Sequence, residues 1–232
     1  MIITAPIPVF GRLPLVRLTA ERLQSQGIIP IMMGHEKEAQ EIAKQLDIEF
    51  IHIDNDPLGA KWNAGFVASK NYNADAVIFM GSSDWASDGY IQRVKEHIAD
   101  YGLIGQLGCH FVDVTNTIRL VHWKGYKDPI RKNEPIGIGR VLNREFLERI
   151  QWRPFDPRLN AGLDWSMWLK TIRTNQEIGI LPCDGSVQLL SISTDKWVNK
   201  HKFTDHWTGP LISERCDVSM LDNEFSQLKQ LL

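Results

Sequence analysis

Apolar and polar positions follow two alternating patterns over the first hundred residues. Short apolar runs at residues 1–5, 28–33, 48–53 and 74–80 have the composition of buried strands. Between these runs, residues 12–26, 39–46, 61–70 and 90–98 place apolar side chains three or four positions apart, as an amphipathic helix does. This alternation predicts βαβ units and a mainly parallel sheet, so the fold class is α/β.

The rhythm changes after residue 102. Residues 103–114 and 117–123 predict two antiparallel strands joined around Asn116, and residues 124–134 form a polar loop. Residues 144–150 and 163–174 predict short helices, and a final amphipathic helix carries Leu221, Phe225, Leu228 and Leu232. No linker or repeat interrupts the chain. We therefore expect one domain over residues 1–232, with functional halves at 1–102 and 103–232.

Composition narrows the function class. The net charge of −2 gives no overall basic field that would attract nucleic acid or acidic membranes. The three cysteines lack CxxC spacing, which argues against a zinc site and a disulfide framework. The start of the sequence has no secretory pattern, and no apolar stretch reaches the ~18 residues that span a bilayer. We therefore expect a soluble cytoplasmic protein.

Polar residues follow three of the predicted strands. Thr4, Pro6 and Arg12 follow the first, and Asn55, Lys61 and Asn63 follow the third. Ser82, Ser83 and Asp84 follow the fourth. Parallel strands bring such positions to one edge of the sheet, where ligands of α/β proteins bind. Two interpretations stay open for these residues: Asp84 binds a ligand or caps the helix that begins near Asp88, and Arg12 and Lys61 bind phosphate or lie at solvated helix ends.

A second carboxylate lies among aromatic residues. Asp164 is flanked by Trp165, with Trp152 and Trp168 nearby in the sequence. Aromatic rings pack on the apolar face of a sugar, and a carboxylate can act as general base toward a hydroxyl. The alternative is that Asp164 caps the 163–174 helix and that the tryptophans belong to the core.

These short motifs, in this order, resemble the nucleotide-sugar-dependent glycosyltransferases of the GT-A fold, in particular the family 2-like group. The resemblance covers the chain from the first strand to about residue 175. Thr4-Ala5-Pro6 with Arg12 resembles the opening T-x-P…R loop of that family, and residues 55–65 resemble its N-x-x-x-G-x-x-x-N-x-G turn. Residues 81–84 take the place of a DxD-type motif, and Gly162-Leu163-Asp164 is similar to its later acidic element.

The resemblance implies a GT-A-like α/β/α sandwich with a mainly parallel central sheet. It also implies transfer of a sugar from a nucleotide diphosphate to an acceptor hydroxyl, with inversion. Asp164 would be the base, and Trp152 and Trp165 would contact the acceptor. Residues 1–102 would hold the donor and residues 103–232 the acceptor. Donor-binding residues would be Thr4, Pro6, Arg12, Asn55, Lys61, Asn63, Ser82, Ser83, Asp84 and Arg140.

A divalent cation, Mn²⁺ or Mg²⁺, is the cofactor that the resemblance implies. Asp84 would be one ligand, and a late histidine, His201 or else His206, a second. Ser82 and Ser83 stand where a first acid is common, so Asp84 is the only carboxylate of this motif.

Two other classes compete with a glycosyltransferase. A nucleotidyltransferase also uses a strand-end acid, but residues 6–12 contain one glycine where that class has a glycine-rich basic loop. A non-catalytic sugar- or nucleotide-binding module would explain the missing first acid. The acceptor is open among a glycan, a protein, a small metabolite and a hydroxymethylated nucleic-acid base. The hint of a nucleic-acid partner is a late cluster of cations and aromatic rings, Lys196, Trp197, Lys200, Lys202 and Trp207, and the alternative is an ordinary surface loop.

Overall fold

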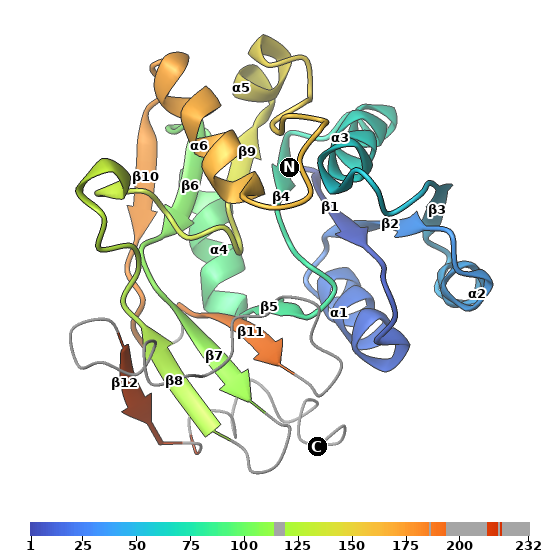
Figure 1. The fold of residues 1–232 in the computed structure, drawn as a ribbon, viewed down its shortest axis with the longest axis horizontal. Helices are drawn as coiled ribbons and strands as arrows, with labels where there is room; N and C mark the ends of the chain where they lie inside the picture. Colours follow the sequence, from blue (N-terminus) through green and yellow to red (C-terminus); the bar gives the residue numbers. More distant parts are fainter. Residues whose placement is uncertain (114–118, 186, 194–212, 218, 220–232) are drawn as a thin grey trace.

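The computed structural model describes residues 1–113, 119–185, 187–193, 213–217 and 219. Two sheets make up the fold (Figure 1). The larger has seven strands in the order β10-β6-β9-β4-β1-β2-β3, and the smaller has five in the order β12-β8-β7-β11-β5. The predicted antiparallel pairing in the second half is confirmed, because β7 pairs with β8 in antiparallel register from Cys109–Trp123 to Asp113–Arg119.

The strands of the larger sheet are β1 (Ile3–Pro8), β2 (Ile29–Gly34), β3 (Glu49–His52), β4 (Ala76–Ile78), β6 (Leu103–Gln106), β9 (Val141–Asn143) and β10 (Ile178–Leu181). The strands of the smaller sheet are β5 (Asp84–Ala86), β7 (Cys109–Asp113), β8 (Arg119–Trp123), β11 (Leu189–Ser193) and β12 (Ser213–Cys216). The helices are α1 (Leu13–Ser25), α2 (Lys37–Gln45), α3 (Leu58–Ala68), α4 (Asp88–His97), α5 (Arg144–Arg149) and α6 (Leu163–Arg173), with 3₁₀ turns η1 (Ser69–Tyr72) and η2 (Pro129–Arg131).

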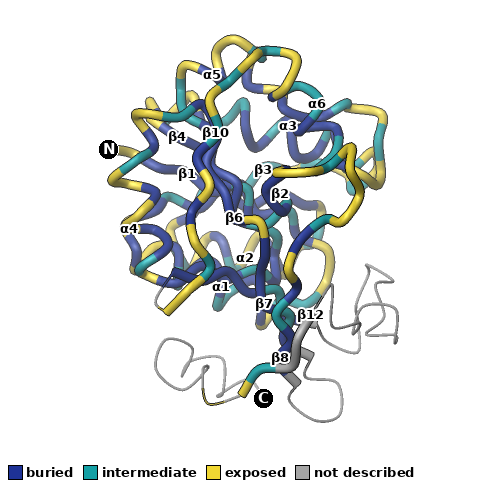
Figure 2. The backbone as a smooth tube through the Cα atoms, turned by 90° about the vertical axis from the view of Figure 1, so that its left-hand side faces the viewer, coloured by how far each residue is buried: buried dark blue, intermediate teal, exposed yellow. Residues whose placement is uncertain are grey.

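Helices cover both faces of the larger sheet. Buried side chains of α1, α2 and α4, such as Val16, Ala43 and Val94, pack in one apolar cluster with alternate residues of β1. Those of α3, α5 and α6, such as Phe66 and Phe146, pack in a second cluster with β4, β6 and β9. The strands in the middle of the larger sheet consist mainly of buried residues, and many exposed residues lie in the outer helices and loops (Figure 2). The α/β/α sandwich predicted from the sequence is confirmed.

Two strand predictions differ from the structure. β1 continues through Pro6 to Pro8, because prolines fit a strand where their missing N–H is not needed and Pro6 packs on α3. Residues 103–114 form two strands, β6 and β7, in different sheets. The predicted C-terminal helix at residues 221–232 lies outside the described residues.

β9 is one of the strands that sequence patterning misses. It lies between β4 and β6 and runs antiparallel to both, with Val77 opposite Leu142 and Ile104 opposite Val141. The chain that enters β9 therefore approaches from the end of the sheet where β4 leaves. Phe79 N donates to Arg140 O at 2.7 Å and Gly139 N donates to Phe79 O at 2.8 Å, so residues 137–140 lie beside the segment that leads to Asp84.

Candidate functional site

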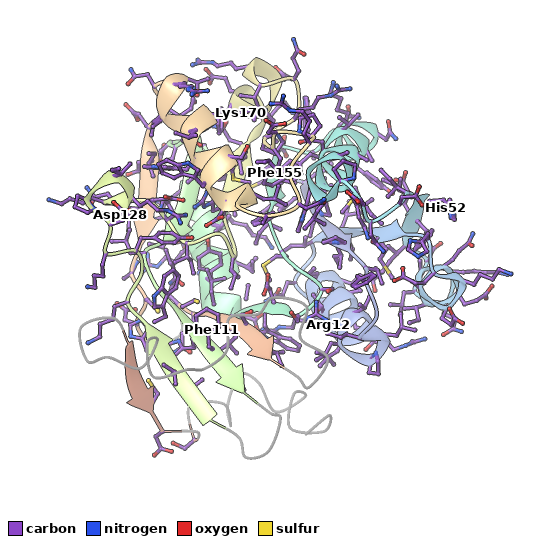
Figure 3. All side chains as sticks on the ribbon, viewed as in Figure 1. Arg12, His52, Phe111, Asp128, Phe155 and Lys170 are labelled. Carbon is purple, nitrogen blue, oxygen red and sulfur yellow. The ribbon has the colours of Figure 1, made fainter. Side chains whose placement is uncertain are left out.

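Polar side chains and one aromatic ring gather at the carboxyl ends of β1 to β4. We call this set the strand-end cluster; its members are Phe10, Arg12, Glu36, Asn55, Lys61, Ser82, Ser83 and Asp84. In Figure 3, Arg12 lies at the start of α1, close to the chain that leads from β4 to β5. These residues come from four separate loops, so the topology of the sheet assembles the cluster.

Arg12 joins the first and fourth of these loops. Its guanidinium donates to Ser83 Oγ at 3.0 Å and to Ser82 Oγ at 3.2 Å. The residue precedes α1 with a left-handed backbone (φ 51°), which turns the side chain across to the serines. Arg12 is therefore not at a solvated helix end. Its partly buried cation lies beside the only carboxylate of the residue 81–84 motif.

Asp84 is held by the protein on both oxygens. Oδ2 accepts from Gly81 N at 2.7 Å, and Oδ1 accepts from Ser191 Oγ at 3.0 Å. Burial raises the pKa of Asp84, and it outweighs these hydrogen bonds and the Arg12 charge. Gly81 permits this arrangement, because a Cβ there would lie 2.7 Å from Asp84 Oδ2. Asp84 does not cap α4, since Ser87 Oγ accepts from Tyr90 N in that role.

Lys61 is buried under the same edge. Its ammonium donates to Val9 O at 2.6 Å and to Asn55 Oδ1. Burial lowers the pKa of Lys61 to about 8, although the charge of Glu36 opposes the shift. Lys61 is thus a cation at the end of the strands and not a solvated helix residue.

Glu36 and Phe10 belong to the cluster although sequence reasoning did not select them. Glu36 Oε1 accepts from Gly11 N at 3.2 Å, and Oε2 has no partner among the described residues. Phe10 follows β1 and is 52% exposed, which is unusual for so large an apolar ring. The available signal in the sequence was an aromatic residue between the first strand and the first helix. The predicted end of the first strand at Ala5 placed Phe10 too far from the strand end to be noticed.

Four of the predicted ligand contacts take structural roles in this arrangement. Thr4 and Pro6 lie inside β1, where Thr4 Oγ1 donates to Ser69 Oγ at 2.7 Å, so their predicted place at the strand end is wrong. Asn63 exchanges two hydrogen bonds with the backbone of Phe155, at 3.0 and 3.1 Å. Trp152 is 4% exposed and packs in the core.

Asp164 lies at a second cluster, at the start of α6. We call it the Asp164 cluster; it comprises Tyr126, Arg131, Glu134, Arg140, Asp164 and Trp165. Asp164 Oδ2 accepts from Arg131 Nη2 at 2.7 Å and from the Tyr126 hydroxyl. The residue is half-buried. Gly162 precedes the helix without a side-chain cap, so Asp164 is not the helix cap.

The charges around Asp164 set its protonation. Burial on its own would raise the pKa of Asp164, but the hydrogen bonds from Tyr126 and Arg131 and the charges of Arg140 and Arg131 outweigh it. The pKa of Asp164 therefore lies below its ordinary value, and the carboxylate is ionised at neutral pH.

Arg140 forms hydrogen bonds with two other members of the Asp164 cluster, Asp164 and Glu134. It is completely buried. Nη1 donates to Asp164 O at 2.6 Å, and Nη2 donates to Glu134 Oε1 at 2.6 Å. Its other bonds go to the carbonyls of Pro135 and Ile136. Arg140 thus positions the loop and α6, and the phosphate contact predicted for it is not available in this arrangement.

The two clusters are joined through the chain beside β4. A Cβ at Gly137 would lie 3.2 Å from Asp164 Cβ and 3.6 Å from Phe79, five residues before Asp84. Phe79 in turn packs on Trp62, with ring centroids 4.2 Å apart. The arrangement places an anionic group and a set of cationic and hydroxyl groups around one end of the sheet.

A divalent cation finds limited support in the described side chains. The described residues contain no group of three metal-ligating side chains. Asp84 is engaged on both oxygens and lies beside the Arg12 cation, whereas Mn²⁺ and Mg²⁺ require several free oxygen ligands. These residues alone do not fit a metal. His201 and His206, the predicted histidine ligands, lie outside the described residues, as do Lys196, Trp197, Lys200 and Trp207.

No family model and no curated protein sequence matches the chain. Solved structures do match in fold. TarS from S. aureus superposes with a TM-score of 0.59 at 11% identity, over 83% of this chain and 37% of that one. TarS 1-349 in complex with UDP gives 0.54 at 10% identity, over 83% and 61%. The Rv0371C complex with manganese from Mycobacterium tuberculosis H37Rv gives 0.50 at 14% identity, over 82% and 91%.

At these identities the comparisons show the fold, a GT-A-like α/β architecture. The chain spans little more than a third of the TarS structure and less than two thirds of TarS 1-349. No helix in the described ranges is long and apolar enough to cross a membrane.

Proposed function

We propose that the protein transfers a sugar from a nucleotide-diphosphate sugar to an acceptor hydroxyl. The observation that carries the proposal is the placement of ionised Asp164 beside the segment that leads to Ser82, Ser83 and Asp84, with Arg12 bound to both serines. The shared fold with a UDP complex supports the donor class.

The strand-end cluster suits a nucleoside diphosphate. Arg12 and Lys61 supply positive charge for the phosphates, and the exposed ring of Phe10 suits stacking on the base. Glu36 Oε2 is buried and makes no hydrogen bond with the described residues, so it would accept one from the base or the ribose after a small movement of the side chain. Ser82 and Ser83 would contact the donor at the point where Asp84 fixes their loop.

Asp164 would take the proton from the acceptor hydroxyl. The hydroxyl oxygen then forms a bond to the anomeric carbon, and the bond from that carbon to the diphosphate oxygen breaks, with its electron pair leaving on the diphosphate. Arg12 stabilises the charge that develops there. Attack opposite to the leaving group inverts the anomeric configuration. Trp165, half-buried next to Asp164, would contact the acceptor.

A divalent cation stays part of the prediction, and it would neutralise diphosphate charge when bound. Both oxygens of Asp84 accept hydrogen bonds from the protein, so Asp84 would have to give up one of them to bind a cation. The other ligands would come from the diphosphate, from water or from His201.

The test is a screen of nucleotide-sugars, with and without Mn²⁺, for binding, for hydrolysis and for transfer. Turnover of one donor that requires Asp164 supports the proposal. Binding without turnover under all conditions favours a non-catalytic binding module, and no binding of any donor rejects the proposal.

A further inference from the structure

A separate cavity lies on the outer side of the Asp164 cluster. Its volume is about 340 Å³, and it lies between Leu107 and the loop of residues 124–134. Asp128, labelled in Figure 3, marks this loop. Gly125 has a φ of 93° and permits the loop to approach Leu107, because a Cβ there would collide with the carbonyl of Leu107. The wall of the cavity therefore lies close against the end of β6.

The charged lining of this cavity is predominantly basic. It includes Lys124, Lys127, Arg131 and Lys132, against Asp128 and Glu134. Both carboxylates already accept hydrogen bonds from the protein. Asp128 Oδ1 accepts from Ile130 N at 2.9 Å. Glu134 accepts from Arg131 at 2.6 and 2.7 Å and from Arg140 at 2.6 Å.

Two of the cations are available to a ligand. Lys127 and Lys132 are exposed, and neither side chain makes an ion pair or hydrogen bond with the residues that the structure describes. An anion in the cavity would meet these ammonium groups without displacing a protein partner.

Arg131 belongs to both the cavity and the Asp164 cluster. Its guanidinium lies 3.4 Å from the centroid of the Tyr126 ring and 5.4 Å from that of Trp165, and it donates to Asp164 at 2.7 Å. An oxyanion that binds near Arg131 therefore competes with Asp164 for the same donors. Occupancy of the cavity would release the carboxylate that the proposed reaction uses as its base.

We propose that the cavity binds an oxyanion, and that its source is a phosphate group on the acceptor. This inference rests on the proposed function and names the class of acceptor: a hydroxyl compound that bears a phosphate. The volume lies at the lower end of the range for ligand pockets, about 300–1,000 Å³, and suits one small charged group.

The binding step is tested with inorganic phosphate, by calorimetry on the whole protein with saturating UDP in the donor site. We expect saturable binding that weakens at least about tenfold in Lys127→Ala/Lys132→Ala, because charge-assisted hydrogen bonds are lost. The control Lys44→Ala/Arg93→Ala removes two exposed cations elsewhere and should bind phosphate normally. Absence of binding, or equal loss in the control, overturns the proposal.

The source is tested by comparing glucose with glucose 6-phosphate as acceptors. We expect the phosphate ester to have a KM at least about tenfold lower, and the double lysine variant to abolish that difference. Stimulation of glucose transfer by free phosphate would instead identify a free anion as the ligand of the same site. If neither effect is observed, the proposal is overturned.

The two proposals fail separately. If no donor binds, the proposed function fails, while phosphate titration of the lysine variants without UDP still tests the cavity. If transfer proceeds and phosphate binding depends on Arg12 and not on Lys127 and Lys132, the cavity proposal fails and the proposed function stands.

Discussion

Arg131 Nη2 lies 2.7 Å from Asp164 Oδ2, so the carboxylate proposed as the base forms an ion pair. A base in this state is ionised and oriented, but one of its oxygens is occupied. The reaction therefore requires the acceptor hydroxyl to reach the free Oδ1 or to displace Arg131. In the proposed reaction, the loop of residues 124–134 would therefore take part through Arg131.

Replacement of the proposed base should stop transfer and spare donor binding. In Asp164→Asn, the amide keeps the shape of the side chain and cannot take a proton, so kcat should fall about 10²- to 10⁴-fold. The affinity for UDP, measured by calorimetry, should change less than about twofold, since Asp164 lies apart from the strand-end cluster. Asp100→Asn, an exposed acid after α4, is the matched control. Unchanged kcat in Asp164→Asn would remove the residue from the mechanism.

The pH profile of transfer should respond to Arg131. Arg131 helps to hold the pKa of Asp164 below its ordinary value, and burial acts in the opposite direction. Without the guanidinium the pKa rises, so the acid limb of kcat/KM should move to higher pH in Arg131→Gln. Arg149→Gln, on the surface of α5, should leave the limb in place. An identical limb in both variants would show that Asp164 does not control it.

Donor affinity should depend on Arg12. Its two hydrogen bonds to Ser82 and Ser83 aim the guanidinium along the strand-end cluster. Arg12→Gln should weaken UDP binding about 10- to 100-fold, because hydrogen bonds to charged groups contribute ~1.5–3 kcal/mol. Arg17→Gln, one turn along α1 and paired with Glu21, is the control. Equal affinities in the two variants would place the diphosphate elsewhere.

Stability at alkaline pH should reflect the burial of Lys61. The folded pKa of about 8 lies below the unfolded value of 10.5. Between these values the unfolded chain binds more protons, so the free energy of unfolding gains a contribution that rises with pH. Urea unfolding from pH 7 to 10 should show this rise in the wild type and lose it in Lys61→Met. Lys44→Met, exposed on α2, should keep the slope; parallel profiles in all three proteins would contradict the shift.

UDP binding should survive removal of divalent cations. Asp84 accepts from Gly81 and Ser191, and Arg12 already supplies positive charge beside it. We expect Mn²⁺ to strengthen UDP binding by less than about tenfold, which corresponds to ~1.4 kcal/mol. Titration in EDTA and then in excess Mn²⁺ measures the ratio. Complete loss of UDP binding in EDTA would show that a metal carries the diphosphate.

The first hundred residues are predictable because their helices and strands are long enough to show a period. The spacing of apolar side chains in residues 12–26 and 39–46 predicts α1 and α2, and apolar runs predict the strands between them. The predicted end of β1 at Ala5 is wrong because Pro6 and Pro8 lie within the strand, and Phe10 therefore escapes the sequence-based set of candidates. Asp84 was identified as a strand-end acid, while its strand, β5, is too short at three residues to be recognised.

The partners of Asp164 could not be read from the sequence. Tyr126 and Arg131 lie 38 and 33 positions away from it, in a polar loop with no periodicity. The sequence predicts a phosphate contact for Arg140, but its side chain is bound by Glu134 and by three carbonyls that local patterning does not reveal. Ionic contacts between distant loops become visible only when the sheet order is known.

The position of β9 has a consequence for how the chain can be divided. Because β9 lies between β4 and β6, a fragment that ends at residue 102 would leave the β4 edge with unpaired N–H and C=O groups, a template for aggregation. Residues 1–102 are therefore contiguous in sequence and yet incomplete as a sheet. We expect β4 to complete its pairing only after synthesis of the chain has passed residue 143.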